Sequence, residues 1–329
     1  MPQRMIQVSA IVVLFAGGVV LADGARDRSN LLTGAVRAYT VQPRDSLVSI
    51  GARFGVSVAT LRAANRLGTT SLLKPGQALQ VDNRHVVPPG GSARADVDLF
   101  QIGGDLSDGI TINIPQRMLF VVRDGRVVYA FPVAVGRADW PSPIGEFTIA
   151  VKEIDPTWDV PSSIQRELAR EGKQVLARVP AGPGNPLGDR WMGLNALSVG
   201  IHGTNAPGSV FRFTTHGCFR LHRDDARALF DAVEVGTPVR VIYEPVIAAM
   251  DENGQLWLEV NPDAYRRAGN LSELALALMR RSFRAIETVD VAAVQKCAGE
   301  ARGRPCLVNR IYERCNLNQK LLSGAAPWN

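Results

Sequence analysis

The stretch IHGTNAPGSVFRFTTHGCFRL, residues 201–221, concentrates reactive side chains. It holds two of the chain's four histidines, His202 and His216, and one of its four cysteines, Cys218. A thiol is a useful nucleophile only as the thiolate, and a neighbouring imidazole can accept its proton. Gly203 and Gly217 free the backbone for tight turns in which amide N–H groups point at one spot, as in an oxyanion hole. The stretch therefore indicates acyl transfer by a cysteine and a histidine.

Two other interpretations fit the same residues. A single cysteine is often an inert core residue or one half of a disulfide. Zinc binds histidine and cysteine, but the stretch offers only three such ligands, and the next acidic residue is Asp224. We expect neither a metal nor a cofactor here.

The motif resembles the signature of the L,D-transpeptidases, the YkuD catalytic domain. That signature is His-Gly, a spacer, Ser/Thr-His-Gly-Cys, an apolar residue, and Arg or Asn. The matching positions are His202, Gly203, Thr215, His216, Gly217, Cys218 and Arg220. The resemblance extends upstream through NPLG at 185–188 and PSPIGEF at 141–147, and covers about residues 107–245.

Short strand-like runs fill the same region, at 111–114, 118–122, 127–131 and 147–151. Asp124-Gly125 between the second and third is a strong hairpin signal. Short β runs separated by turns predict a mainly β fold, a sandwich or barrel-like domain, and the family resemblance implies a β-sandwich.

The resemblance implies an acyl-enzyme reaction on peptidoglycan stem tetrapeptides. Cys218 is the expected nucleophile, His202 the base, and the Gly203 carbonyl the group that orients His202. We expect the backbone N–H groups of Gly217 and Cys218 to form the oxyanion hole. The acceptor is left open: a second stem (a 3→3 cross-link), the amine of an envelope protein, or water.

Supporting roles are expected for further residues. His216 orients the loop and substrate, and Thr215 hydrogen-bonds within the turn. Arg220 binds a substrate carboxylate or forms a structural ion pair. Asn205 and Met192 are candidate substrate-binding residues, although Met192, like Trp191, fits the core equally well. His222 lies outside the pattern, at a surface or helix-start position.

Two departures from the family pattern concern substrate shape. Phe219 is bulkier than the usual aliphatic residue, and Val210-Phe211-Arg212 replaces a common Ile-Gly. Residues 155–184 are an insertion with a helix from about residue 161, and they act as a lid or as a surface excursion.

Residues 38–82 resemble a LysM module, a family that binds N-acetylglucosamine-containing glycans such as peptidoglycan. DSL at 45–47, AN at 64–65 and LKPGQ at 73–77 carry the match. Capping serines and a glycine stop predict the order β-α-α-β. We expect binding here rather than catalysis. A non-catalytic peptidoglycan-binding scaffold is the competing function class for the whole chain.

The N-terminus predicts export. Arg4, an apolar run from Val8 to Leu21 and a cleavage signal at 20–22 (VLA) describe a signal peptide at 1–22, or else an uncleaved membrane anchor. We therefore expect a periplasmic or cell-envelope protein. The net charge of +6 is spread along the chain without the lysine and arginine blocks of a nucleic-acid binder.

Two segments remain. Residues 83–106 are rich in Pro, Gly and Ser and predict a linker in which His85 is exposed. Residues 246–329 form a C-terminal extension with a strand at 256–260, a helix over 271–294, and Cys297, Cys306 and Cys315. An oxidising compartment favours one disulfide among these three cysteines, of unspecified pairing.

Overall fold

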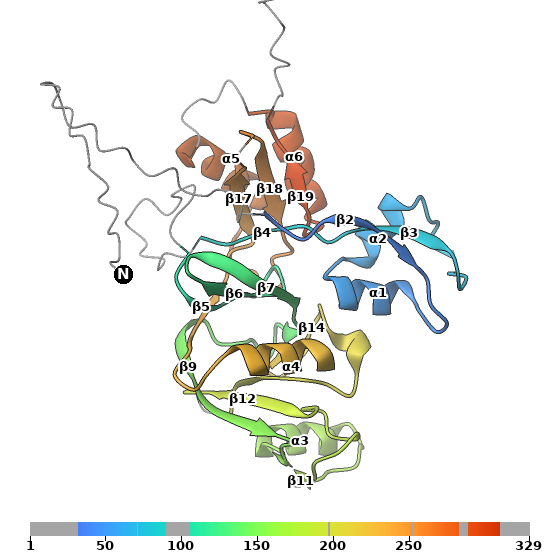
Figure 1. The fold of residues 1–329 in the computed structure, drawn as a ribbon, viewed down its shortest axis with the longest axis vertical. Coiled ribbons are helices and arrows are strands. Elements are labelled where there is room, and N and C mark those ends of the chain that lie inside the picture. The colour runs from blue at the N-terminus through green and yellow to red at the C-terminus, as the bar shows by residue number, and fades with distance from the viewer. Residues whose placement is uncertain are drawn as a thin grey trace, which may run out of the picture.

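The computed structural model describes residues 32–70, 72–89, 106–196, 198–251, 253–282 and 289–309. The predicted signal peptide and Cys315 lie outside the described residues. Figure 1 shows three parts: an N-terminal module, a central β-rich domain, and a C-terminal subdomain at the end of the molecule remote from α3.

The N-terminal module has the predicted β-α-α-β order. Strand β2 (Val36–Thr40) pairs antiparallel with β3 (Ala78–Asp82), and helices α1 (Leu47–Phe54) and α2 (Val58–Ala64) lie between them in the chain. Ser46 caps α1 in a capping box with Ser49, and Ser57 caps α2. Gly55 ends α1 in the left-handed conformation, so the capping signals in the sequence are confirmed.

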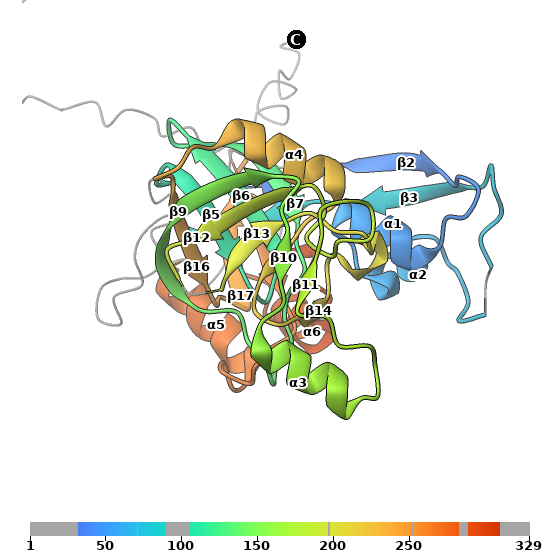
Figure 2. The same ribbon diagram turned by 90° about the horizontal axis from the view of Figure 1, so that it is seen from below.

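The central domain is built on one curled sheet of eight strands (Figure 2). Their order is β15-β13-β12-β9-β16-β5-β6-β7. Neighbours are antiparallel except for the pairs β13–β15 and β5–β16. The bounds are β5 Gly109–Asn113, β6 Met118–Arg123, β7 Arg126–Pro132, β9 Gly145–Ile154, β12 Arg190–Leu194, β13 Gly200–His202, β15 Phe219–Arg220 and β16 Pro238–Ile242. The predicted mainly β fold is confirmed.

Local signals also hold in this domain. Asp124 and Gly125, both at positive φ, turn β6 into β7, as the Asp-Gly pair predicts. Helix α4 (Arg223–Ala232) packs Ala226 and Leu229 into the main core against the sheet. The inserted segment holds helix α3 (Ser162–Arg170) and the short strands β10 (Trp158–Asp159) and β11 (Arg178–Val179). Short elements β8 (Val135–Gly136), β14 (Phe213–Thr215) and the 3₁₀ turn η2 (Pro207–Ser209) complete the domain.

The C-terminal subdomain, residues 246–309, has its own core. Strands β17 (Val246–Met250), β18 (Leu256–Val260) and β19 (Pro305–Leu307) form a sheet under helices α5 (Leu271–Ser282) and α6 (Val291–Glu300). The predicted helical character of residues 271–294 is confirmed, and it is divided between two helices, α5 and α6. Val289 bridges to Asn309 in a strand-like contact, and the Asp290 side chain caps a new helix by accepting from Ala293 N–H.

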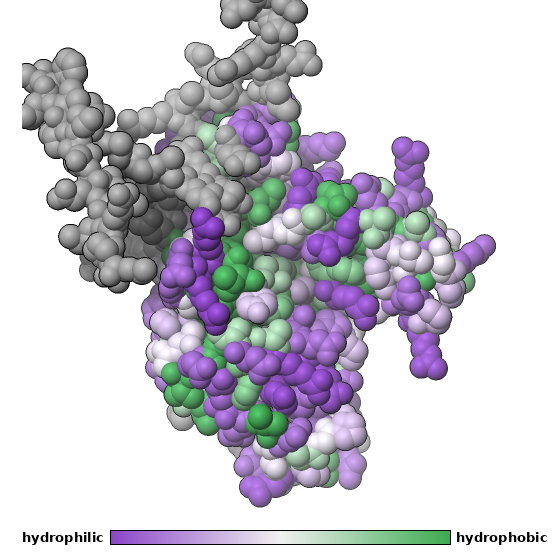
Figure 3. Space-filling view, viewed as in Figure 1, coloured by the Kyte–Doolittle hydropathy of each residue, from purple (hydrophilic) through white to green (hydrophobic). Residues whose placement is uncertain are grey.

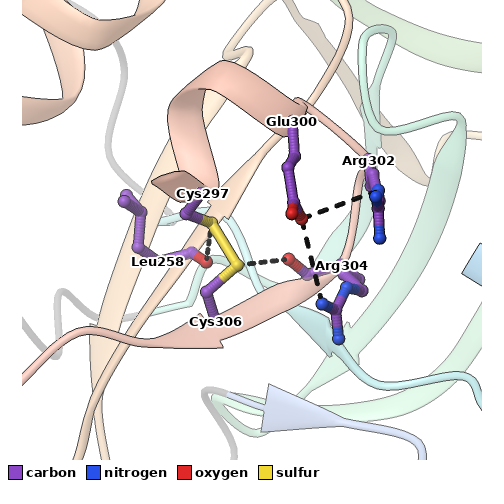
Figure 4. Close-up of a disulfide and its surroundings, with 6 residues drawn as sticks. All are labelled: Leu258, Cys297, Glu300, Arg302, Arg304 and Cys306. Atoms are coloured by element: carbon purple, nitrogen blue, oxygen red, sulfur yellow. Dashed lines mark hydrogen bonds and ion pairs between the residues drawn. A yellow bond between two sulfur atoms is a disulfide. The ribbon is translucent and has the colours of Figure 1, made fainter. Parts of the chain in front are cut away.

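One disulfide is present among the described cysteines. Cys297 on α6 bonds to Cys306 on β19, as Figure 4 shows. Glu300 lies beside the bridge and within ion-pair distance of Arg302 and Arg304. The disulfide therefore ties a helix to the edge strand of its own sheet.

The prediction that His85 is exposed is wrong. Strand β4 (His85–Val86) pairs with β1 (Leu32–Thr33), and His85 is 1% exposed. Its Nε2 lies 2.9 Å from the Gly55 carbonyl and its Nδ1 3.1 Å from Glu259 Oε1. The Pro- and Gly-rich composition concealed this strand, because its partner strand comes from the polar segment before the module. The start of the expected linker thus joins all three parts of the molecule.

The surface is mixed in character. Figure 3 shows hydrophilic and hydrophobic side chains interspersed, with hydrophilic ones gathered over α4. Among the described residues no single helix is long and apolar enough to cross a membrane. The helices α1 and α2 together meet the length and hydropathy thresholds, but they are bent by 104° relative to each other.

Candidate active site

His202 is the last residue of β13, and Cys218 directly precedes β15, the strand that lies parallel to β13. In the β13–β15 pair, Ile201 is opposite Phe219 and His202 is opposite Arg220. Because side chains alternate along a strand, Cys218 and Arg220 lie on the same face as His202. The other face carries Ile201 and Phe219, both completely buried in the main core. Pleat and register together therefore bring the thiol, the imidazole and the guanidinium to one side of the sheet.

His202 is held as a neutral imidazole. Its side chain is buried, and Nδ1–H donates to the Gly203 carbonyl at 2.7 Å, which leaves Nε2 as the proton acceptor. Burial, with a smaller contribution from the nearby Arg220 charge, lowers the pKa of His202 to about 3. The Gly203 carbonyl therefore fixes the tautomer of the ring.

Cys218 is half-buried, and its Sγ lies 3.5 Å from the Ser198 carbonyl. Burial raises the pKa of its thiol, and the charge of Arg220 opposes that effect only in part. The resting pair is therefore a thiol and an imidazole rather than a thiolate and an imidazolium. For this thiol to act as a nucleophile, its proton has to be transferred during the attack.

The turn before Cys218 is closed by hydrogen bonds. Thr215 Oγ1 donates to the Cys218 carbonyl at 2.6 Å and accepts from Gly217 N–H at 3.3 Å. Gly217 has φ +106°, in the region that favours glycine. Among the described residues the Cys218 N–H has no acceptor. Of the two N–H groups expected in an oxyanion hole, Gly217 N–H is engaged in the turn and Cys218 N–H is available.

Cys218 and His202 open onto a cavity of about 740 Å³, which suits a peptide-sized ligand. Aromatic walls come from Trp140, Trp158 and Trp191. The ring of Trp191 lies 5.8 Å from that of His202, and a Cβ on Gly200 would come within 2.5 Å of it. Glycine at this position therefore lets the indole lie across the strand beside the base.

His216 connects the turn formed by residues 215–218 to the inserted segment. Its Nε2 lies 2.5 Å from Glu167 Oε2 on α3, and its ring meets Trp140 edge-on at 4.6 Å. Arg137 hydrogen-bonds to the same carboxylate and holds the pKa of Glu167 below its usual value. The insertion thus borders the cavity and is pinned to the turn.

Arg220 also faces the cavity. One guanidinium nitrogen donates to Ser209 Oγ at 2.9 Å, and its buried Nε has no acceptor among the described residues. No carboxylate in the described part of the chain lies within ion-pair distance of it. An anionic ligand group can therefore satisfy this side chain.

Other expected residues lie elsewhere. Met192 is completely buried, opposite Ile201 on the core face, whereas its neighbour Trp191 lines the cavity. Asn205 is exposed and donates to the Gly184 carbonyl, outside the cavity wall. His222 occupies the N-cap position of α4, a helix start as predicted.

The residues at the two departures from the family pattern also lie outside the cavity. Phe219 fills the core. Val210 and Phe211 pack in a cluster with Ala52 of α1 and Phe120, so they form part of the contact with the N-terminal module.

Sequence reasoning missed several residues near the site, namely Trp140, Glu167, Tyr265 and Arg267. Trp140 and Arg267 line the cavity, Glu167 binds His216, and Tyr265 is hydrogen-bonded to Ser142. Tyr265 and Arg267 come from the C-terminal subdomain, for which no motif in the sequence indicated a role. Among the described residues no cluster of three or more His, Cys, Asp or Glu side chains is placed to hold a metal ion.

Fold and site define a class: mainly β proteins whose curled sheet presents a thiol and a neutral imidazole on one face of a peptide-sized cavity. The chain belongs to the L,D-transpeptidase family. A family model of the L,D-transpeptidase catalytic domain matches residues 107–241, and a LysM domain model matches residues 39–82.

Curated relatives support this assignment over most of the chain. The probable L,D-transpeptidase ErfK/SrfK of Escherichia coli (strain K12) is 31% identical over 312 residues, 88% of this chain and 93% of that protein. Its namesake in Salmonella typhimurium is 30% identical over 294 residues, 86% and 88% of the two chains. The probable L,D-transpeptidase YbiS of Escherichia coli (strain K12) is 30% identical over 247 residues, 73% and 72%.

Among solved structures, L,D-transpeptidase 3 from Mycobacterium tuberculosis aligns with 24% identity and a TM-score of 0.33. The alignment covers 40% of this chain and 60% of that one.

Proposed function

We propose that this protein is an L,D-transpeptidase that acts on peptidoglycan stem tetrapeptides through a thioester on Cys218. The observation that supports this most strongly is the β13–β15 register, which puts Cys218, His202 and Arg220 on one face of a large cavity.

In the proposed first step, His202 Nε2 takes the thiol proton while Cys218 Sγ attacks a carbonyl carbon. That carbonyl belongs to the L-centre of the diamino acid, the third residue of the stem. The Cys218 N–H stabilises the oxyanion. The bond to the terminal D-alanine then breaks, and the D-alanine nitrogen takes the proton from His202. The product of this step is a thioester on Cys218.

In the second step an acceptor amine attacks the thioester and gives up a proton to His202. The carbon–sulfur bond breaks, and the proton returns to the thiolate. With the side-chain amine of another stem as acceptor, the product is a 3→3 cross-link. Arg220, with its unsatisfied buried Nε, binds a carboxylate of the substrate.

The remaining parts serve the same reaction. The LysM module binds the glycan strand, and the buried junction at His85 keeps this module attached beside the catalytic domain. The His216–Glu167 contact keeps the inserted segment against the cavity as part of the substrate-binding wall. This substrate places the protein in the cell envelope.

The test incubates the protein with a disaccharide-tetrapeptide and identifies products by mass spectrometry. A cross-linked dimer supports transpeptidation, and tripeptide alone indicates that water is the acceptor. A second reaction contains an added envelope lipoprotein. If the stem peptide is then joined to the lipoprotein and the dimer forms only without it, the acceptor is a protein amine.

Matched variants separate catalysis from binding. We expect His202→Ala to abolish product and His222→Ala, at a helix start outside the cavity, to leave turnover unchanged. A wild-type protein that binds peptidoglycan but releases no D-alanine would instead support a non-catalytic scaffold.

A further inference from the structure

One segment of the C-terminal subdomain lies against the cavity. This segment, residues 261–270, follows β18. The Asp263 carboxylate accepts from Arg267 N–H and Ala268 N–H, both at 2.9 Å, and from the Tyr243 hydroxyl at 2.6 Å. The Tyr243 hydroxyl in turn accepts from Tyr265 N–H at 2.8 Å. The backbone that carries Tyr265 is therefore fixed from two sides.

Aromatic contacts fix the side chain of Tyr265 as well. Its ring stacks on Tyr243, with centroids 5.2 Å apart and 22° between planes, and meets Phe213 edge-on at 6.2 Å. Its hydroxyl donates to the Gly136 carbonyl at 2.7 Å and accepts from Ser142 N–H at 3.1 Å. The hydroxyl thus has a defined position and two defined partners.

Ser142 connects Tyr265 to the turn before Cys218. It is 3% exposed, and its Oγ accepts from Gly136 N–H at 2.9 Å. The same Oγ donates to the Gly217 carbonyl at 2.8 Å. The Tyr265 hydroxyl donates to the Gly136 carbonyl, and Ser142 Oγ accepts from the Gly136 N–H. With the bond from Ser142 N–H to the Tyr265 hydroxyl, the three residues form a hydrogen-bonded ring next to the turn.

The Gly217 carbonyl belongs to the same peptide group as the Cys218 N–H. The described chain has no cis peptide bond, so the carbonyl and the N–H of this group point in opposite directions. When Ser142 holds the carbonyl on one side, the N–H is held on the other side, where among the described residues it has no acceptor. Rotation of this peptide would remove the available donor from the oxyanion position.

We propose that Tyr265 is a positioning residue for catalysis. Acting through Ser142, it holds the Gly217–Cys218 peptide so that the Cys218 N–H faces the developing oxyanion. The C-terminal subdomain is on this account a component of the active site rather than an appendage. The inference rests on the proposed acyl transfer, because only a reaction with an oxyanion requires this donor.

The test compares two reactions of the same thiol in Tyr265→Phe, which removes the hydroxyl and keeps the ring. Acylation of Cys218 by a tetrapeptide or a carbapenem passes through an oxyanion, whereas alkylation by iodoacetamide does not. We expect acylation to slow by roughly 10- to 100-fold, less than the loss of an oxyanion donor outright. Alkylation should stay near wild type, and the loss should fall on kcat rather than KM. The melting temperature should fall by a few degrees, because the Gly136 carbonyl and the Ser142 N–H lose their partner at about 1–3 kcal/mol each.

A double-mutant cycle tests the route of the effect. Ser142→Ala should give a loss similar to that of Tyr265→Phe, and the double variant should lose little more, because both act on one peptide. Ser142→Thr keeps the hydroxyl and should recover part of the activity. Tyr129→Phe on β7, where the ring stacks on Phe131, is the matched control and should behave as wild type.

Three results would overturn the inference. One is acylation by Tyr265→Phe within twofold of wild type. Another is a fall of alkylation in parallel with acylation, which indicates a structural role alone. The third is losses that multiply in the double variant. If the tetrapeptide fails as a substrate but a carbapenem acylates Cys218, the proposed function fails while the carbapenem rates still test Tyr265. If neither acylates Cys218, both proposals fail.

Discussion

The buried carboxylate of Glu259 gives the most quantitative prediction for the junction between the three parts of the chain. It has no exposed surface and accepts three hydrogen bonds: from His85 Nδ1 at 3.1 Å, Val86 N–H at 2.7 Å and Gln116 Nε2 at 3.1 Å. Glu259→Leu leaves His85 Nδ1 and Val86 N–H buried without their partner, at about 1–3 kcal/mol each, while Gln116 Nε2 keeps its 2.8 Å hydrogen bond to the Val86 carbonyl. Measured losses for one partner of a buried pair are about 3–5 kcal/mol, and we expect a value in that range.

Glu259→Gln should cost much less. Its amide oxygen can still accept from Val86 N–H and Gln116, and its NH₂ can donate to Nδ1 of a neutral His85. The other nitrogen of that ring, Nε2–H, remains bonded to the Gly55 carbonyl. The order of stability is therefore wild type, then Gln, then Leu.

Calorimetry and limited proteolysis measure this effect. At about 2–4 °C per kcal/mol, Glu259→Leu should lower the melting temperature by about 10 °C, and cleavage near residue 86 should accelerate. Glu234→Leu, at a side chain that is 87% exposed, is the control and should shift the transition little. A Leu variant within about 1 °C of wild type, or a Gln variant as unstable as Leu, would refute this account of the junction.

Three further predictions concern the site itself. Because burial raises the pKa of Cys218, the thiol stays protonated at neutral pH, and its alkylation by iodoacetamide should rise with a midpoint above that of a free cysteine, about 8.5; a midpoint near 7 would indicate a preformed thiolate. Gly200→Ala puts a Cβ within 2.5 Å of Trp191 and should slow acylation at least tenfold by a roughly one-ångström displacement, whereas Gly299→Ala, with open space around it on α6, should not. Phe219→Leu should cost about 1 kcal/mol or more of stability with KM unchanged, since the ring fills the core; a changed KM with unchanged stability would place it in the cavity.

Much of the architecture follows from local signals. Ser46, Ser57 and Gly55 mark the ends of α1 and α2, and Asp124-Gly125 marks a hairpin, because capping and turn chemistry act over a few residues. The candidate pair of Cys218 and His202 could also be identified from the sequence, since both residues lie in one short stretch.

The register was not predictable from the residues alone. Trp191 and Met192 are neighbours, and one lines the cavity while the other fills the core. A shift of one residue exchanges these roles, and only the pairing of Met192 with Ile201 decides between them.

Long-range polar contacts were the least predictable features. His85 lies 174 positions from Glu259, and Tyr265 lies 123 from Ser142. No periodicity or turn signal encodes such pairs. Segment composition suggested an exposed linker and gave the C-terminal extension no role, whereas tertiary packing buries His85 and Val86 at the start of the linker and brings Tyr265 and Arg267 of the extension beside the candidate site.

The most direct test of the central claim is the mass of the acyl-enzyme. Protein mixed with a disaccharide-tetrapeptide and quenched in acid should carry an adduct equal to the substrate minus D-alanine. Peptide mapping should locate this adduct on Cys218, and Cys218→Ala should carry none. An adduct on another residue, or unchanged turnover by Cys218→Ala, would contradict the assignment of Cys218 as the nucleophile.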